Sequence, residues 1–259
     1  MLPAIHDTGT GAAVLFLHAF TLDASQWDHQ VAALSGDMRC VRIDLWGCGA
    51  SPAPPDGEAT LDGFASAALA ALDSLHIERV AVVGLSMGGY LAFALWRLAP
   101  ERIRALVLCN THATADAAGA RDDRIAMAGQ VEREQSVESI VEPMVVRMLS
   151  PQAQAEAHIV DPVRGRIRRC TPAGIAFAQR AMATRPDSTE LLASITVPSL
   201  VIAGSQDAII PTHEVLAMAD RIPGARYAEL DCGHISNLER PRAVNQQLAE
   251  FLVPARMTS

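Results

Sequence analysis

The chain has 259 residues, of which 50% are hydrophobic and 19% charged, and its formal net charge at neutral pH is −8. This length can bury a full hydrophobic core, and single α/β domains of this size are common. The acidic balance argues against a nucleic-acid-binding surface, which needs clustered positive charge. All 21 basic residues are arginine, which excludes lysine Schiff-base chemistry and lysine-dependent phosphate loops.

The five cysteines are widely spaced and include no C-x-x-C pair, so neither a disulfide framework nor a zinc site is predicted. Two of them, Cys48 and Cys232, are expected to be small apolar residues that fill space in loops. The first residues carry no basic patch followed by an apolar run, and no segment reaches the ~20 apolar residues of a membrane span. We therefore expect a cytoplasmic protein with no nucleic-acid or membrane partner and no metal or organic cofactor.

Six short apolar runs predict the strands of a parallel sheet, because strands covered on both faces are apolar almost throughout. The runs begin at Ala13, Cys40, Val80, Ala105, Pro198 and Ala225. Helical patterns alternate with them and begin at Thr60, Gly88, Thr212 and Arg242. Thr60 is a plausible N-cap, and the second pattern stops near Pro100. This alternation predicts an α/β fold, with no strand before Ala13.

One segment, from about Thr111 to Leu192, contains no predicted strand, only helical patterns rich in Ala, Arg and Glu. Because it lies between two strands, we expect it above the carboxyl edge of the sheet, where open α/β sheets bind ligands. We predict a helical lid of residues 112–192, inserted into a core of residues 1–111 and 193–259. The alternative is a helical decoration far from any site.

The pentapeptide Gly84-Leu85-Ser86-Met87-Gly88 fits the pattern G-x-S-x-G. An apolar run leads into it and a helical pattern leads out, which is the context that a nucleophile elbow requires. The glycines leave room for a sharp turn that holds the serine in a strained conformation with its hydroxyl exposed. Ser86 is therefore the predicted nucleophile, and the alternative is a tight turn that happens to contain a serine.

A serine hydroxyl becomes a good nucleophile only when a base takes its proton. His234 follows the last predicted strand and is the strongest candidate for this base. Asp207 follows the preceding strand and is predicted to accept the other ring N–H, with Asp231 as a weaker choice. The remaining histidines are expected on the surface (His6, His29, His76, His158), at the start of the lid (His112) and at the start of a helix (His213).

A tetrahedral oxyanion needs two preorganised N–H donors. One is predicted to be the amide of Met87, directly after the nucleophile, and the other the amide of Phe20, in the loop after the first parallel strand. His18 in that loop is expected to brace it through a side-chain hydrogen bond rather than to act as a base.

Several motifs together make the chain resemble the α/β-hydrolase superfamily throughout its length. They are "LHAF" at Leu17, "DLWGCGAS" at Asp44, "GLSMGG" at Gly84, "GSQD" at Gly204 and "GHISNLERP" at Gly233. With "ALVLCNT" at Ala105 and "ARYAELDCGHISNLERP" at Ala225, the chain looks most like the 3-oxoadipate enol-lactonases and related carboxylesterases. The resemblance implies a mostly parallel sheet flanked by helices, with an inserted helical lid.

The same resemblance implies Ser86 as nucleophile, Asp207 as acid and His234 as base, with Phe20 and Met87 as the oxyanion amides. The chain departs from the family in having Ala19 where glycine is common, and in a lid whose only aromatic residue is Phe177.

The expected reaction is hydrolysis of a small carboxylic ester or lactone through an acyl-enzyme, with 3-oxoadipate enol-lactone as a candidate substrate. An anionic lactone would suit a lid arginine, although most arginines in the run "RGRIRRC" from Arg164 are expected to face solvent. One alternative is hydrolysis of a carbon–carbon bond in a diketone-like substrate. Another, from a different class, is a ligand-sensing protein with slow turnover. Dehalogenases and epoxide hydrolases fit less well, because they carry aspartate where this chain has Ser86.

Overall fold

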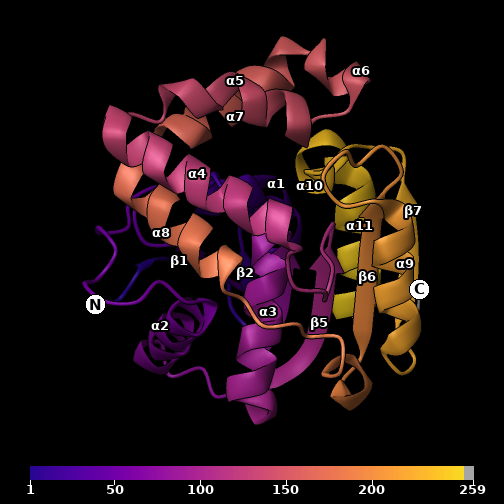
Figure 1. The fold of residues 1–259 in the computed structure, drawn as a ribbon. Helices are drawn as coiled ribbons and strands as arrows, with labels where there is room; N and C mark the ends of the chain where they lie inside the picture. The colour runs from indigo at the N-terminus through magenta and orange to yellow at the C-terminus, as the bar shows by residue number, and fades with distance from the viewer. Residues whose placement is uncertain (254–259) are drawn as a thin grey trace.

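The computed structural model describes residues 1–253, so that residues 254–259 of the predicted core lie outside the described part. Seven strands form one sheet in the order β1-β3-β2-β4-β5-β6-β7 (Figure 1). The six predicted strands are confirmed and run parallel. They are β2 (Ala13–Leu17), β3 (Arg39–Asp44), β4 (Val80–Leu85), β5 (Ile103–Cys109), β6 (Ser199–Gly204) and β7 (Arg226–Leu230).

The seventh strand, β1 (Ala4–Thr8), corrects the prediction that no strand precedes Ala13. It pairs antiparallel with β3, and its residues are only half-buried or exposed. An edge strand of this kind needs no apolar run, so the sequence shows no strand signal there. The turn that follows it depends on Gly9, which has φ 85° and lies so close to Met38 that a Cβ would meet its carbonyl oxygen at 2.3 Å.

Helices cover both faces of the sheet. α2 packs against α3 on one face and α1 against α11 on the other (Figure 1). As predicted, the Thr60 side chain caps α2 by accepting from the Gly63 amide at 3.0 Å, and α3 ends before Pro100. These helices are α1 (Asp28–Leu34), α2 (Leu61–Ser74), α3 (Met87–Leu98), α9 (Thr212–Arg221), α10 (Ser236–Glu239) and α11 (Pro241–Leu252), with short 3-10 turns η1 (Ala24–Trp27), η2 (Pro100–Arg102) and η3 (Leu192–Ser194). None of the helices in residues 1–253 is long and apolar enough to cross a bilayer.

The hydrophobic core lies between these helices and the central strands. Every residue of β2, β4 and β6 is buried, which explains their continuous apolar sequences. Burial of each of their valine, leucine, isoleucine and phenylalanine side chains contributes about 1.5–3 kcal/mol, so the centre of the sheet is a rigid support for the loops at its carboxyl edge.

Between β5 and β6 the chain forms only helices, as predicted. They cross above the carboxyl ends of the strands, with α4 and α8 packed along each other (Figure 1). We call this segment, residues 112–192, the helical insertion. Its helices are α4 (Ala118–Glu134), α5 (Glu138–Met148), α6 (Pro151–Gln154), α7 (Ala157–Arg168) and α8 (Pro172–Ala183).

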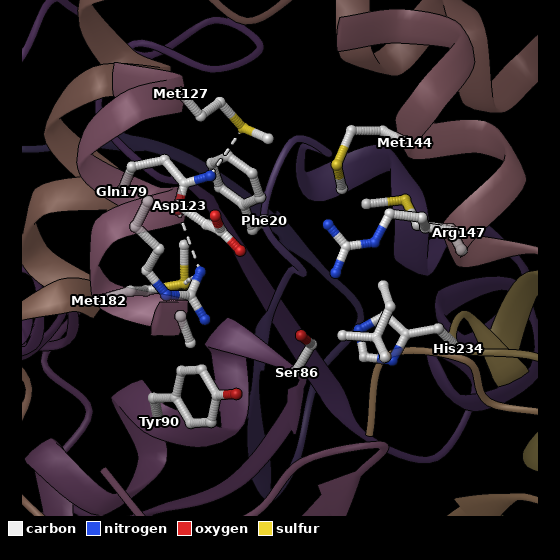
Figure 2. Close-up of a pocket in the computed structure, with 14 residues that line it drawn as sticks. Phe20, Ser86, Tyr90, Asp123, Met127, Met144, Arg147, Gln179, Met182 and His234 are labelled. Carbon is white, nitrogen blue, oxygen red and sulfur yellow. Dashed lines mark hydrogen bonds between the residues drawn. The ribbon is translucent and has the colours of Figure 1, made fainter. Parts of the chain in front are cut away.

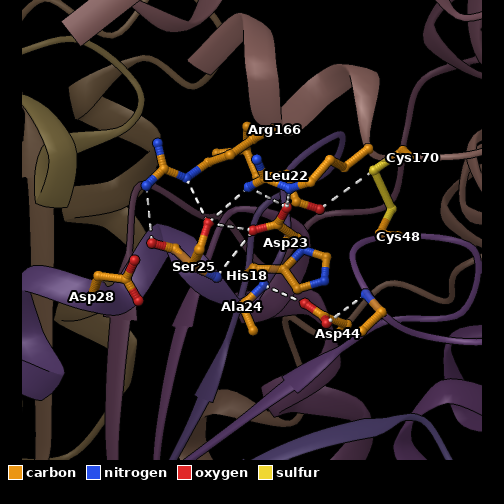
Figure 3. Close-up of polar contacts among 12 residues, drawn as sticks. His18, Leu22, Asp23, Ala24, Ser25, Asp28, Asp44, Cys48, Arg166 and Cys170 are labelled. Atoms are coloured by element: carbon orange, nitrogen blue, oxygen red, sulfur yellow. Dashed lines mark hydrogen bonds and ion pairs between the residues drawn. A yellow bond between two sulfur atoms is a disulfide. The ribbon is translucent and has the colours of Figure 1, made fainter. Parts of the chain in front are cut away.

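A disulfide between Cys48 and Cys170 ties the helical insertion to the core (Figure 3). It corrects two expectations: that the cysteines form no disulfide, and that Cys48 is a free residue filling a loop. The two cysteines are 122 positions apart, so their spacing carried no signal. Beside the disulfide, the Thr171 amide donates to the Gly47 carbonyl at 2.7 Å. Cys40, Cys109 and Cys232 are free and buried.

Candidate active site

Ser86 lies at the sharp turn from β4 into α3. Its φ of 55° and ψ of −114° lie in a region that residues other than glycine rarely adopt. A Cβ on Gly84 would meet the Gly88 carbonyl oxygen at 2.2 Å, and a Cβ on Gly88 would meet the Leu17 carbonyl oxygen at 2.1 Å. Both glycines of the motif are therefore required by close backbone approach, which is the physical reason for this sequence pattern.

His234 and Asp207 form a hydrogen bond of 2.8 Å between Nδ1 and Oδ2, and both side chains are buried. The amides of Ile209 and Ile210 donate to the other carboxylate oxygen at 2.8 and 3.0 Å. Burial acts to raise the pKa of Asp207, but the His234 ring and these amides lower it below its ordinary value. Because an ionised Asp207 can only accept, Nδ1 carries the proton, and Nε2 of the neutral ring is left as an acceptor.

The other acid that the sequence offered, Asp231, accepts from Gln206 rather than from His234. Among the remaining histidines, His6 lies at the surface as expected, with 40% of its side chain exposed, and its Nε2 is 3.0 Å from Asp44 Oδ2. His112 packs against Tyr90, with ring centroids 5.6 Å apart. The others are exposed: His29, His76, His158 and His213, the last of these near the start of α9 as predicted.

In the loop after β2, side-chain hydrogen bonds hold both the amide and the carbonyl of Ala19. Nε2 of His18 accepts from the Leu45 amide at 2.9 Å, so Nδ1 carries the proton and donates to the Ala19 carbonyl at 2.9 Å. Burial lowers the pKa of His18, which keeps this ring neutral. The Gln26 side chain accepts from the Ala19 amide at 2.8 Å. The prediction that His18 braces this loop is confirmed, and the loop presents Phe20 to the site.

A cavity of about 130 Å³ lies between the core and the helical insertion. Ser86 and His234 lie on its floor, and side chains from α4, α5 and α8 form its walls (Figure 2). Phe20 also lines it, whereas the Met87 side chain is buried and does not. The walls include Met127, Met144, Met148 and Met182. Methionine is flexible and polarisable, so such walls can adapt to substrates of different shape.

Two arginines line this cavity, and neither belongs to the run that begins at Arg164. Arg124 is bonded to Asp116 and to Gln179. Arg147 is exposed and has no ion-pair or hydrogen-bond partner among residues 1–253, and Asp123 faces it from the opposite wall (Figure 2). The run itself faces elsewhere: Arg164, Arg166, Arg168 and Arg169 bond to Glu142, Ser25, Glu138 and Asp23, respectively.

Two residues at the end of β5 contact the candidate site and were not singled out from the sequence. Asn110 is fully buried and has φ 46°. Its amide nitrogen donates to Asp207 Oδ2 at 3.1 Å and to the Gly233 carbonyl at 3.3 Å. The Thr111 hydroxyl donates to the Ser86 carbonyl at 2.9 Å. The available signal was two polar residues directly after an apolar strand, at the carboxyl edge of the sheet.

The part of the chain that the structure describes holds no group of three or more His, Cys, Asp or Glu side chains placed to bind a metal ion.

Comparison with known proteins gives one consistent family. A model described as the alpha/beta hydrolase family matches residues 14–247. The chain is 30% identical over 252 residues to 3-oxoadipate enol-lactonase 1 of Acinetobacter baylyi, which covers 96% of this chain and 91% of that protein.

Solved structures agree with the sequence comparison. A malate-bound thermophilic esterase from Thermogutta terrifontis superposes with a TM-score of 0.93 at 37% identity, covering 96% of this chain and 92% of that one. The enol-lactonase from Burkholderia xenovorans superposes with a TM-score of 0.88 at 30% identity, covering 96% and 95%. The chain is therefore an enzyme that belongs to the alpha/beta hydrolase family.

Proposed function

We propose that this hydrolase cleaves a small carboxylic ester or lactone, with Ser86 as nucleophile, His234 as base and Asp207 as the orienting acid. The observation that carries the proposal is the buried 2.8 Å pair of His234 and Asp207, on the floor of the cavity that also exposes the strained Ser86. The enol-lactonases and esterases among the similar proteins support this substrate class, with 3-oxoadipate enol-lactone as the first candidate.

The proposed reaction begins with attack of Ser86 Oγ on the substrate carbonyl while His234 Nε2 accepts its proton. Asp207 stabilises the imidazolium that forms. The backbone amides of Phe20 and Met87 are proposed to hold the oxyanion, and loss of such a donor typically costs ~10²–10³ in rate. His234 then protonates the leaving alkoxide and activates a water molecule, which releases the carboxylic acid and regenerates the serine.

The helical insertion, residues 112–192, is proposed to act as a lid over a core made of residues 1–111 and 193–259. Most of the side chains that line the cavity come from the insertion, while the three reacting groups come from the core. The small volume favours a compact acyl or lactone group. Arg124 and Arg147 are the arginines that line the cavity and so could meet an anionic substrate, whereas the arginines of the run from Arg164 to Arg169 bond to other partners.

The test is kcat/KM measured in parallel for 3-oxoadipate enol-lactone and p-nitrophenyl acetate, with Ser86→Ala as the blank. A kcat/KM for the lactone that is several orders of magnitude above that for the acetate supports lactonase action, and comparable kcat/KM values support a short-chain esterase. Ester turnover by a folded Ser86→Ala protein at the wild-type rate would refute the proposal. A single slow turnover of every ester would instead indicate a ligand-sensing role, and cleavage of a diketone without ester turnover would indicate carbon–carbon bond hydrolysis.

A further inference from the structure

The end of α5 packs directly on the loop that carries His234. The His234 amide donates to the Met148 carbonyl at 2.9 Å. Beside it, a Cβ on Gly233 would lie 2.5 Å from the Ser150 amide nitrogen and 2.9 Å from the Leu149 carbonyl carbon. Only glycine therefore allows this approach, and the residue before the proposed base is fixed by contact with the helical insertion.

A buried carboxylate completes this contact. Glu239, in α10, is 5% exposed, and its two oxygens accept from the Ser150 hydroxyl at 2.6 Å, the Ser150 amide at 3.1 Å and the Gly233 amide at 3.1 Å. Within residues 1–253 it forms no ion pair. A buried charge is costly unless donors compensate it, and here the donors come from two segments that are distant in sequence. The carboxylate thus holds Ser150 of the insertion against Gly233 of the core.

We propose that Glu239 is a positioning residue that acts through this bridge: it joins the end of α5 to the His234 loop so that the cavity wall and the base keep one relative placement. The inference rests on the proposed role of His234. It adds a residue that does not line the cavity and that no part of the proposed reaction uses.

The bridge has a consequence for catalysis because α5 also supplies the cavity wall. Met144, Arg147 and Met148 of α5 line the cavity, and the Met148 carbonyl is the acceptor for the His234 amide. Substrate held against these side chains is therefore held at a fixed distance from the base. Since a displacement of about 1 Å can cost ~10²-fold in rate, loosening the bridge should lower the rate of proton transfer more than it weakens binding.

The test compares Glu239→Leu, which keeps bulk but removes both acceptor oxygens, with Glu239→Gln, which keeps one, and with Ser150→Ala on the other side of the bridge. Thr171→Ala is the matched control. The hydroxyls of Ser150 and Thr171 each cap a helix of the insertion, by accepting from the amides of Ala153 and Gly174, but Thr171 lies away from His234. Three quantities are measured: kcat and KM for p-nitrophenyl acetate, the rate at which a fluorophosphonate labels Ser86, and the thermal midpoint.

We expect kcat and the labelling rate to fall by up to ~10²-fold in Glu239→Leu, and by less in Glu239→Gln and Ser150→Ala, with KM changed little. The double variant Glu239→Leu with Ser150→Ala should be no slower than Glu239→Leu alone, because both changes break one bridge. Thr171→Ala should keep wild-type kcat and labelling.

Wild-type kcat and labelling in a folded Ser150→Ala and Glu239→Gln, or a double variant whose losses simply multiply, would overturn the inference. Should Glu239→Leu not fold, the other two variants decide. Failure of the proposed function is distinct, since the wild-type protein would then show no fluorophosphonate on Ser86.

Discussion

Ser86 holds a backbone conformation that costs of the order of 1–3 kcal/mol for a residue other than glycine. Hydrogen bonds on both sides maintain it. The Ser86 amide donates to the Cys109 carbonyl at 2.9 Å, and the Ser86 carbonyl accepts from the Thr111 hydroxyl at 2.9 Å. The strain thus lies at the residue proposed to be the nucleophile, where it turns the hydroxyl toward the cavity.

This strain predicts that Ser86→Gly is more stable than Ser86→Ala by about 1 kcal/mol, because glycine adopts positive φ freely while alanine keeps the strain. The measurement is the free energy of unfolding in urea. Ser66, exposed in the middle of α2, is the matched control. At that position we expect Ser66→Ala to be more stable than Ser66→Gly by about 1 kcal/mol, since glycine is less favourable in a helix. Equal stabilities of the two Ser86 variants would contradict the strain argument.

The contact between Asn110 and Asp207 gives a second prediction for a single residue. The Asn110 side-chain amide donates to Asp207 Oδ2, the oxygen that His234 Nδ1 also contacts. Asn110→Gly keeps the positive φ available but removes this donor, so the acid and the His234 loop lose a shared support. We expect kcat/KM for an ester to fall by about tenfold to 10²-fold, mostly in kcat.

Gln135→Gly is the control for this variant, because Gln135 also has a positive φ, 49°, but is exposed at the end of α4. It should leave kcat/KM unchanged. Wild-type kcat in a folded Asn110→Gly would show that the contact with Asp207 does not matter for catalysis.

At the scale of elements, the sequence was sufficient for the buried strands β2, β4, β5 and β6 and for the helices that begin near Thr60 and Gly88, because burial on both faces and helical spacing leave a direct record in composition. The partly buried strands β3 and β7 were also found. β1 was missed because an edge strand needs no such record. α1 (Asp28–Leu34) was also missed, since its 7 residues make only two turns, too few to show a helical period.

The residues of the candidate site likewise divide into those that the sequence predicts and those that it does not. Ser86 was predicted from its glycine motif. Asp207 and His234 were predicted from their positions after two strands, because loops after parallel strands meet at one edge, and from the family resemblance. Asn110, Glu239 and the Cys48–Cys170 disulfide were not found, because each depends on which distant segments come into contact. Periodicity and local motifs contain no information about such contacts.

The two ends of the helical insertion are joined by a buried ion pair that predicts a pH effect. Asp116, before α4, contacts Arg185, after α8, at 2.8 Å, and Arg124 at 2.5 Å. Burial acts to raise the pKa of Asp116, but the Arg124 hydrogen bond and the two positive charges lower it below its ordinary value. Its stabilisation is therefore complete above the unfolded pKa of about 4 and is lost as pH falls through the lower folded value.

Asp116→Asn should lower the free energy of unfolding by about 3 kcal/mol near neutral pH, because it leaves the buried Arg185 unpaired. The difference from wild type should shrink as the pH of the urea titration is lowered below about 4. Asp62→Asn breaks the exposed pair with Arg97 and should change stability by less than about 1 kcal/mol. A difference for Asp116→Asn that stays constant with pH would argue against this role of the carboxylate.

Over the whole molecule, three sets of contacts hold the helical insertion, two of them against the core and one between its own two ends. Glu239 holds the end of α5, and the pair of Asp116 and Arg185 joins the two ends of the insertion. The third set surrounds the turn between α7 and α8. There Arg169 contacts Asp23 at 2.7 Å, beside the Cys48–Cys170 disulfide (Figure 3). The cavity lies between the core and the helical insertion that these contacts hold.

The disulfide is the covalent link among these contacts, and its cysteines are 122 positions apart. Cross-linking a loop of that length restricts the unfolded chain and is expected to contribute about 3–5 kcal/mol. A reductant should therefore lower the thermal midpoint of the wild-type protein to that of Cys48→Ala with Cys170→Ala, and should leave the midpoint of this double variant unchanged. Cys40→Ala, which removes a free buried cysteine, should keep the response to reductant. Two free thiols at Cys48 and Cys170 in the unreduced protein, detected by alkylation and mass spectrometry, would show that the link does not form and that the turn between α7 and α8 is held by its hydrogen bonds and ion pair alone.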